Sequence, residues 1–173
     1  MKIIKNLSEF IKIILVVLGI ISYNPKVNID NIYVYRDFAN PENIRAQIKF
    51  SNLLNSSITE IIKSGVEVEF ICFVKTRCNK EIVFSDKSIK RINYQKDFFV
   101  ANKIKFDDEK KLEQWLSIFD FVVLSNANNL ISRPLETEID VFCRSELNVD
   151  LMKLWGNRPK ILITYSIEKK NED

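Results

Sequence analysis

Histidine is absent from this chain of 173 residues, and glycine and proline are scarce. The lack of histidine removes the commonest general base and the commonest metal ligand of proteins. Only three glycines and four prolines are present. A glycine-rich loop that cradles phosphate is therefore excluded, because it needs several positions without a side chain. From these absences we predict no catalytic residue, no cofactor and no metal site, and we identify no small-molecule substrate.

The charge of the chain does not favour a nucleic-acid partner. The formal net charge is +3, but the first 22 residues hold three lysines and one glutamate and so account for +2 of it. The remaining +1 offers no basic surface that would follow a phosphate backbone. The apolar fraction of 46% and the chain length instead predict one packed globular domain.

Residues 1–22 have the pattern of a secretory leader. Lys2 and Lys5 precede the apolar run of residues 13–21, which has the length of a signal-peptide core and is short for a membrane-spanning helix. The residues after the run form a poor cleavage site, so a cleaved signal peptide and an uncleaved membrane anchor are both open. A buried N-terminal helix is a third alternative. We expect a linker at 23–31, a domain at 32–168 and a charged tail at 169–173.

The stretch from Ser57 to Lys75 specifies structure most clearly. Ser57 and Glu60 have the spacing of a capping box, which predicts the start of a helix. Gly65 falls where a left-handed residue would end that helix, so we predict a positive φ there. The apolar residues then alternate with period two, as expected for a half-buried strand; they are Val66, Val68, Phe70, Cys72 and Val74.

The remaining patterns predict several strands and a second helix. Strands are expected at 32–36, 44–50, 81–84, on both sides of a turn at 95–97, and at 121–124, 136–144 and 161–167, with further turns at 78–80 and 85–87. The second helix begins at Asp107, and its buried face is predicted to hold Leu112, Trp115, Leu116 and Phe119. Short connections between so many strands predict an α+β fold, an antiparallel β-sandwich or flattened barrel with two short helices.

Three segments carry a family resemblance. Residues 61–68 look like a helix-to-strand turn with a Ser-Gly-Val step, residues 91–94 with 99–100 look like a strand pair, and Trp155 precedes a closing strand. On these segments, residues 44–167 resemble an uncharacterised bacterial family, the domain of unknown function numbered forty-three ninety. This resemblance implies export and the arrangement of strands with two short helices, and it implies no activity. The tryptophan-rich stretch of many members is missing at 75–79.

Two groups of side chains are candidates for chemistry. Cys72 and Cys143 lie on the inward phase of their strands, and Cys78 follows a strand. They are either buried free thiols or, for a pair on neighbouring strands, a disulfide. Carboxylates at 107–109 either bind a cation or act as an acid/base pair, or they serve the start of the second helix, which is the interpretation we favour.

Two surface segments are candidates for binding a partner. The basic segment 87–96 contains Lys90, Arg91 and Tyr94 and either contacts anionic head groups or an acidic partner, or is a solvated strand face. The turn at 155–159 either presents Trp155 and Arg158 as anchors for a partner or packs them against the domain.

We therefore expect an exported or N-terminally anchored envelope protein that is not an enzyme. Its expected role is that of a binding, scaffold or sensor-accessory module, with another envelope protein or the membrane surface as partner. One alternative is an extracytoplasmic hydrolase that uses carboxylates. Another is a regulator tethered on the cytoplasmic side, although Lys2 and Lys5 ahead of the apolar run favour a domain outside.

Overall fold

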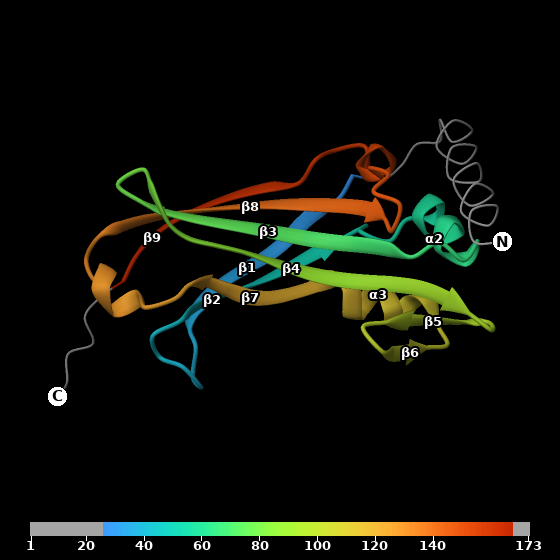
Figure 1. The fold of residues 1–173 in the computed structure, drawn as a ribbon, viewed down its shortest axis with the longest axis horizontal. Coiled ribbons are helices and arrows are strands. Elements are labelled where there is room, and N and C mark those ends of the chain that lie inside the picture. The colour runs from blue at the N-terminus through green and yellow to red at the C-terminus, as the bar shows by residue number, and fades with distance from the viewer. Residues whose placement is uncertain (1–25, 168–173) are drawn as a thin grey trace.

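The chain folds into two antiparallel β-sheets and two short α-helices (Figure 1). The structure is a computed structural model that describes residues 26–167. The elements in chain order are β1 (Asn28–Arg36), β2 (Ile44–Ser51), α2 (Ser56–Lys63), β3 (Val68–Cys78), β4 (Glu81–Gln95), β5 (Phe98–Ala101), β6 (Ile104–Phe106), α3 (Glu109–Ser117), β7 (Ile118–Leu124), the 3-10 turn η1 (Ala127–Leu130), β8 (Pro134–Ser145), the 3-10 turn η2 (Met152–Trp155) and β9 (Lys160–Ser166). The α+β class predicted from the sequence is confirmed at this level.

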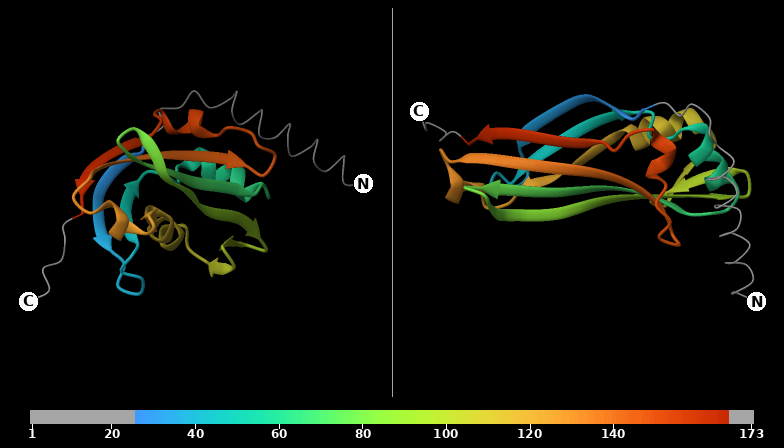
Figure 2. Two further views of the ribbon diagram at one scale, coloured as in Figure 1. Left: turned by 60° about the vertical axis from the view of Figure 1, so that its left-hand side comes forward. Right: turned by 90° about the horizontal axis from the view of Figure 1, so that it is seen from above.

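The sheets have three and six strands. Their orders are β1-β2-β7 and β6-β5-β4-β3-β8-β9, and all neighbours pair antiparallel. Figure 2 shows the two sheets on opposite sides of a common interior. The inner side chains alternate with outward ones, as the sequence predicts for β2, where Ile44, Ala46, Ile48 and Phe50 are all buried. This alternation places the apolar core between the sheets.

One buried polar contact joins the inner faces of the two sheets, and a second lies beside it within the six-stranded sheet. The hydroxyl of Thr76 on β3 lies 2.5 Å from the carbonyl oxygen of Val123 on β7 and 2.7 Å from the hydroxyl of Thr137 on β8. Both threonines are fully buried. Buried hydroxyls are tolerated in a core only when their hydrogen bonds are satisfied, and here the bond to Val123 also joins the two sheets.

The predicted break in the fourth strand is wrong. A turn was expected at 85–87, but β4 runs without interruption, and Ser85, Asp86 and Lys87 pair with β3. The long ladder with β3 outweighs the weak local preference of these polar residues for a turn. The predicted hairpin before β4 is confirmed, and its turn residues Asn79 and Lys80 have φ values of 51° and 71°, as a tight hairpin turn requires.

The start of α2 also differs from the prediction. The capping residue is Asn55, whose side-chain oxygen accepts from the backbone N–H of Ile58 at 3.0 Å; the helix therefore begins before Ser57. Its amide nitrogen donates to the carbonyl oxygen of Leu154 at 2.7 Å, so one side chain caps the helix and holds η2. The positive φ predicted for Gly65 is confirmed at +91°.

The second helix is shorter than expected. Asp108 is its capping residue, accepting from the backbone N–H of Lys110 at 2.8 Å, and the helix begins at Glu109. Leu112 and Leu116 are fully buried, as predicted. Trp115 is only half-buried. Phe119 is buried but lies on β7, because the helix passes directly into that strand with no loop.

The domain boundaries predicted near the termini fall partly outside the described residues. The expected leader at 1–22 and tail at 169–173 lie outside them. β1 begins at Asn28, within the expected linker, and Val27 is already buried. Between residues 26 and 167, no helix is long and apolar enough to cross a membrane.

Candidate functional site

The candidate site lies on the outer face of the six-stranded sheet, where β3 runs between β4 and β8 (Figure 1). The alternation of β3 turns Phe70 and Cys72 into the core and turns Glu69, Ile71 and Phe73 outward. An outward row on a central strand would ordinarily be polar. Here two of its members are apolar, and Ile71 is only 9% exposed, so neighbouring side chains cover part of this face.

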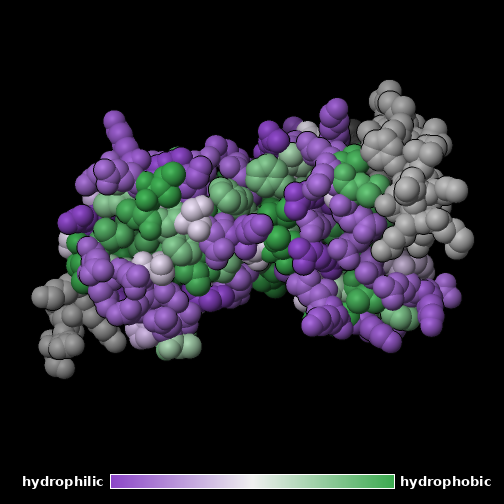
Figure 3. Space-filling view, in the orientation of Figure 1, coloured by the Kyte–Doolittle hydropathy of each residue, from purple (hydrophilic) through white to green (hydrophobic). Residues whose placement is uncertain are grey.

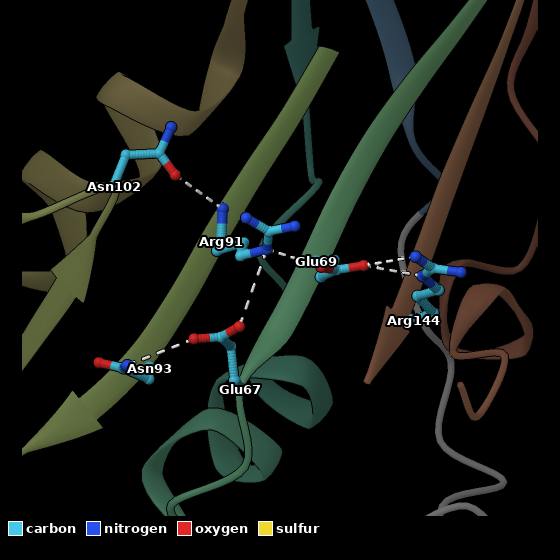
Figure 4. A network of polar contacts seen from close by, with 6 residues as sticks. All are labelled: Glu67, Glu69, Arg91, Asn93, Asn102 and Arg144. Carbon is cyan, nitrogen blue, oxygen red and sulfur yellow. Dashed lines mark hydrogen bonds and ion pairs between the residues drawn. The ribbon is translucent and has the colours of Figure 1, made fainter. Parts of the chain in front are cut away.

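Glu69 joins three strands on this face (Figure 4). Its partners in the ladders are Arg91 on β4 and Arg144 on β8. Arg91 Nε donates to one carboxylate oxygen at 2.7 Å, and Arg144 donates through Nε and Nη2 to the other at 2.8 Å. Glu67 lies 3.9 Å from Arg91 and accepts from the amide of Asn93 at 3.5 Å. The cluster fixes the direction of both guanidinium groups.

The cluster keeps Glu69 ionised. Burial raises the pKa of this carboxyl group, but the hydrogen bonds and charges of Arg91 and Arg144 outweigh that effect and leave the pKa below its usual value. Such a carboxylate is a poor proton donor at neutral pH. We interpret Glu69 as a group that positions Arg144.

An open groove lies beside this cluster, and we name it the outer groove. Its volume is about 400 Å³. Its floor is apolar and its rim is polar; the lining residues are Ile71, Phe73, Phe142, Cys143, Arg144, Asn148, Asp150, Met152 and Arg158. Figure 3 shows apolar surface on this face of the molecule, bordered by hydrophilic side chains. The groove thus offers an apolar contact area next to fixed charges.

Arg158 is the free cation of this rim. Its guanidinium carbon lies 5.7 Å from the centroid of the Phe142 ring, a cation–π arrangement. No carboxylate of residues 26–167 lies within ion-pair distance of it. An anionic group on a ligand would therefore meet a guanidinium without an internal partner. Arg158 was one of the residues predicted to bind a partner, and its exposure is compatible with that role.

Trp155 does not share this exposure, and its prediction as an anchor for a partner is wrong. The side chain is fully buried, its ring lies 6.2 Å from Phe70, and its indole N–H donates to the carbonyl oxygen of Leu53 at 2.9 Å. The alternative that Trp155 packs against the domain is correct. Gly156, with a φ of +66°, reverses the chain after η2 and lets Arg158 emerge on the surface. Arg158 stacks on Phe142 and not on Trp155.

The prediction that Lys90 binds a partner is also wrong, because its side chain points inward. Its ammonium group donates to the carbonyl oxygens of Trp115 at 2.5 Å and Ile118 at 2.6 Å, and lies 4.5 Å from the Phe119 ring centroid. Burial lowers the pKa of Lys90 to about 8. The side chain caps the carboxyl end of α3, where a cation is favoured, and it is not part of a basic surface.

The other two residues of that basic segment are also engaged. Arg91 is exposed over 54% of its side chain but is paired with Glu69. Tyr94 is half-buried, with its ring centroid 5.0 Å from that of Phe99 in an edge-to-face contact. The structure therefore does not bring Lys90, Arg91 and Tyr94 together on one surface, because alternation places Arg91 on the opposite face of β4.

The cysteines are buried free thiols. Cys72, Cys78 and Cys143 form no disulfide, so the first of the two alternatives is correct. Burial raises the pKa of Cys72 and of Cys143 above the usual range of a thiol. A thiol that stays protonated is a weak nucleophile.

Asp108 has the structural role that the sequence favoured, as the cap of α3. Glu109 accepts from the hydroxyl of Thr59 at 3.2 Å and pairs with Lys63 at the same distance, so it ties α3 to α2. In the part of the chain that the structure describes, no three histidine, cysteine or acidic side chains are grouped as metal ligands.

No model of a known protein family matches this chain, and no curated protein matches it either. The resemblance to the domain of unknown function numbered forty-three ninety stays a prediction.

The sequence reasoning missed the outer groove. Phe73, Phe142 and Met152 come from separate segments, and only the strand order brings them together. One signal was present in the sequence: Ile71 and Phe73 fall on the outward phase of an otherwise alternating strand. Two apolar residues on that phase indicate a covered or ligand-binding patch.

Proposed function

We propose that this chain is a non-enzymatic binding or scaffold module whose outer groove docks a segment of a protein partner. The observation that carries the proposal is Arg158, a cation with no carboxylate partner among residues 26–167, which lies against Phe142 at the rim of an apolar groove. Aromatic and arginine side chains with this mix of apolar floor and polar rim are typical of protein-binding surfaces.

The alternative function, a carboxylate-dependent hydrolase, has less support. Such an enzyme needs two carboxyl groups in different protonation states around a bound substrate. Glu69, the most buried carboxylate of this face, is held by two arginines that keep it ionised. A carboxylate that is paired with two arginines and stays ionised is better suited to positioning those arginines than to proton transfer.

We also propose that the module acts outside the cytoplasm, exported or tethered through residues 1–22, with an envelope protein as its partner. The basis is the positive start and apolar run of that segment. Protease added to cells with a permeabilised outer layer should digest the domain. Protection until the inner membrane is broken would contradict this location.

We propose further that the two sheets form the predicted sandwich or flattened barrel. The hydrogen bond of Thr76 to Val123 on the opposite sheet supports this arrangement.

The binding function is tested by co-purification from intact envelope with three versions of the tagged full-length chain. These are the natural chain, Arg158→Glu and the control Lys49→Glu, which reverses an exposed charge on β2 of the other sheet. The proposal expects one identified protein to be retained by the first and third versions and lost from Arg158→Glu. Equal recovery with all three would contradict it.

A further inference from the structure

The strongest further feature is the loop between β1 and β2, residues 37–43, which we name the Phe38 loop. Phe38 is 96% exposed, more than any other large apolar side chain between residues 26 and 167. A single exposed apolar residue is common on protein surfaces, and it has no meaning by itself. Whether Phe38 is suited to binding depends on the conformation of the loop and on the charges beside it.

Hydrogen bonds order the backbone of the Phe38 loop. Asp37 and Asn43 close its base, with the N–H of Asp37 donating to the carbonyl oxygen of Asn43 at 2.9 Å. The Asp37 carboxylate accepts from the N–H of Ala39 at 2.9 Å. The carbonyl oxygen of Glu42 accepts from the N–H of Ala127 at 2.8 Å, which fixes the loop to the domain. Because the backbone of the loop is already ordered, binding of the ring costs little backbone entropy.

The carboxylate of Glu42 in the loop is complementary in charge to Arg158 at the outer groove. Asp37 is paired with Arg45 at 3.5 Å. The exposed carboxylate of Glu42 has no ion-pair partner among residues 26–167. The outer groove has an apolar floor with Phe142, and its rim carries the cation Arg158 and also Asp150, whose carboxylate accepts from the backbone N–H of Met152 at 2.8 Å. The loop thus supplies an aromatic ring next to a free anion, and the groove supplies an aromatic surface next to a free cation.

One molecule cannot join its own loop to its own groove. In Figure 1 the Phe38 loop projects at the lower left, whereas η2 and the end of β8, which border the outer groove, lie at the opposite end of the molecule. Any contact between the two surfaces must therefore form between copies.

We propose that the Phe38 loop of one copy docks in the outer groove of a second copy, with the Phe38 ring on Phe73 and Phe142 and the Glu42 carboxylate at Arg158. This inference rests on the proposed function and names the partner as the chain itself. One ring and one exposed ion pair give a weak contact, because the cost of association offsets most of the gain. Such a contact is suited to reversible self-association at a surface where copies are concentrated.

The test uses two full-length copies carrying different tags and expressed together. In the first copy Phe38 is replaced by the photoreactive residue p-benzoylphenylalanine; in the matched control the same residue replaces Ile82, an exposed apolar residue at the tip of the β3–β4 hairpin. The proposal expects an adduct from position 38 that maps to peptides around Phe142 or Arg158 of the second copy. No adduct between copies, or an adduct that maps elsewhere, would overturn it.

A charge swap decides whether the ion pair is formed. Arg158→Glu in the second copy should reduce the adduct about 2- to 5-fold, the range of an exposed ion pair. Glu42→Arg in the first copy should restore it. An adduct that is indifferent to both changes would also overturn the proposal. If position 38 gives no adduct while the envelope experiment still identifies another protein that depends on Arg158, the self-association fails and the proposed function stands. If both experiments fail, the proposed function fails with it.

Discussion

The ammonium nitrogen of Lys90 on β4 lies 4.2 Å from the centroid of the Trp115 ring on α3. The same nitrogen donates to the carbonyl oxygen of Trp115 and to that of Ile118. These contacts connect the six-stranded sheet to the junction of α3 and β7, where no backbone ladder joins the two sheets. Lys90 therefore serves stability, at the cost of burying a charge.

Lys90 should make stability depend on pH. Burial lowers its pKa in the folded chain to about 8, from 10.5 for a free lysine. Between these values the unfolded chain binds more protons, so the free energy of unfolding should rise with pH. From pH 7 to pH 9.5 we expect the natural chain to gain about 1–2 kcal/mol relative to Lys90→Met. Urea unfolding at both pH values measures this.

The control for Lys90 is Lys87→Met, which removes an exposed lysine from the same strand. This variant should keep the pH dependence of the natural chain. The same pH dependence in Lys90→Met would show that the ammonium group is not desolvated in the folded chain.

Gly65→Ala should lower stability through backbone strain alone. Gly65 has a φ of +91°, and a β-carbon at this position would meet no atom within 4 Å. The expected loss is about 1 kcal/mol, the usual cost of placing alanine in this region. Denaturant titration measures it, and an unchanged midpoint would contradict the conformation.

The two tryptophans should differ in their environments. Trp155 is fully buried, and Trp115 is half-buried against Phe106 at 5.7 Å between ring centroids. Acrylamide should therefore quench Trp115, observed alone in Trp155→Phe, more strongly than Trp155, observed alone in Trp115→Phe. Trp155→Phe should also cost about 1–3 kcal/mol, because the buried carbonyl oxygen of Leu53 loses its donor. Equal quenching of the two tryptophans would contradict the partial exposure of Trp115 on α3 or the burial of Trp155.

Glu138 should contribute to stability only above acidic pH. Hydrogen bonds from Lys160 and Arg77 lower its pKa to about 2. Because this pKa is below that of the unfolded chain, the contribution is complete above about pH 4.5 and is lost as the pH falls towards 2. The stability difference between the natural chain and Glu138→Gln should shrink over that range. Glu136→Gln, a change to an exposed neighbour, should show no such trend, and a constant difference for Glu138→Gln would contradict the interpretation.

The sequence predicted local structure correctly where a single local pattern determines the backbone conformation. The inward residues of β2, the left-handed Gly65 and the hairpin at Asn79 and Lys80 all follow from local geometry, and all are confirmed. The prediction of a turn at 85–87 failed because these residues continue the ladder with the preceding strand β3. The local preference of polar residues for a turn does not include the stabilisation by such a ladder.

The site was harder to predict than the fold. Basic residues close in the sequence were expected to act together, but alternation on β4 sends Lys90 inward and Arg91 outward. Arg158 and Phe142 are 16 positions apart in the sequence and meet only because η2 folds back over β8. Sites built across strands in this way depend on strand order, which single-sequence patterns do not specify.

Photocrosslinking from within the outer groove tests the central claim most directly. With p-benzoylphenylalanine in place of Phe142, the full-length chain in living cells should give a protein adduct that becomes weaker when Arg158→Glu is added. The same photoreactive residue in place of Lys49, exposed on the other sheet, should give no such adduct. Adducts of equal yield from both positions, or an adduct from position 142 that is unaffected by Arg158→Glu, would contradict a binding role for the outer groove.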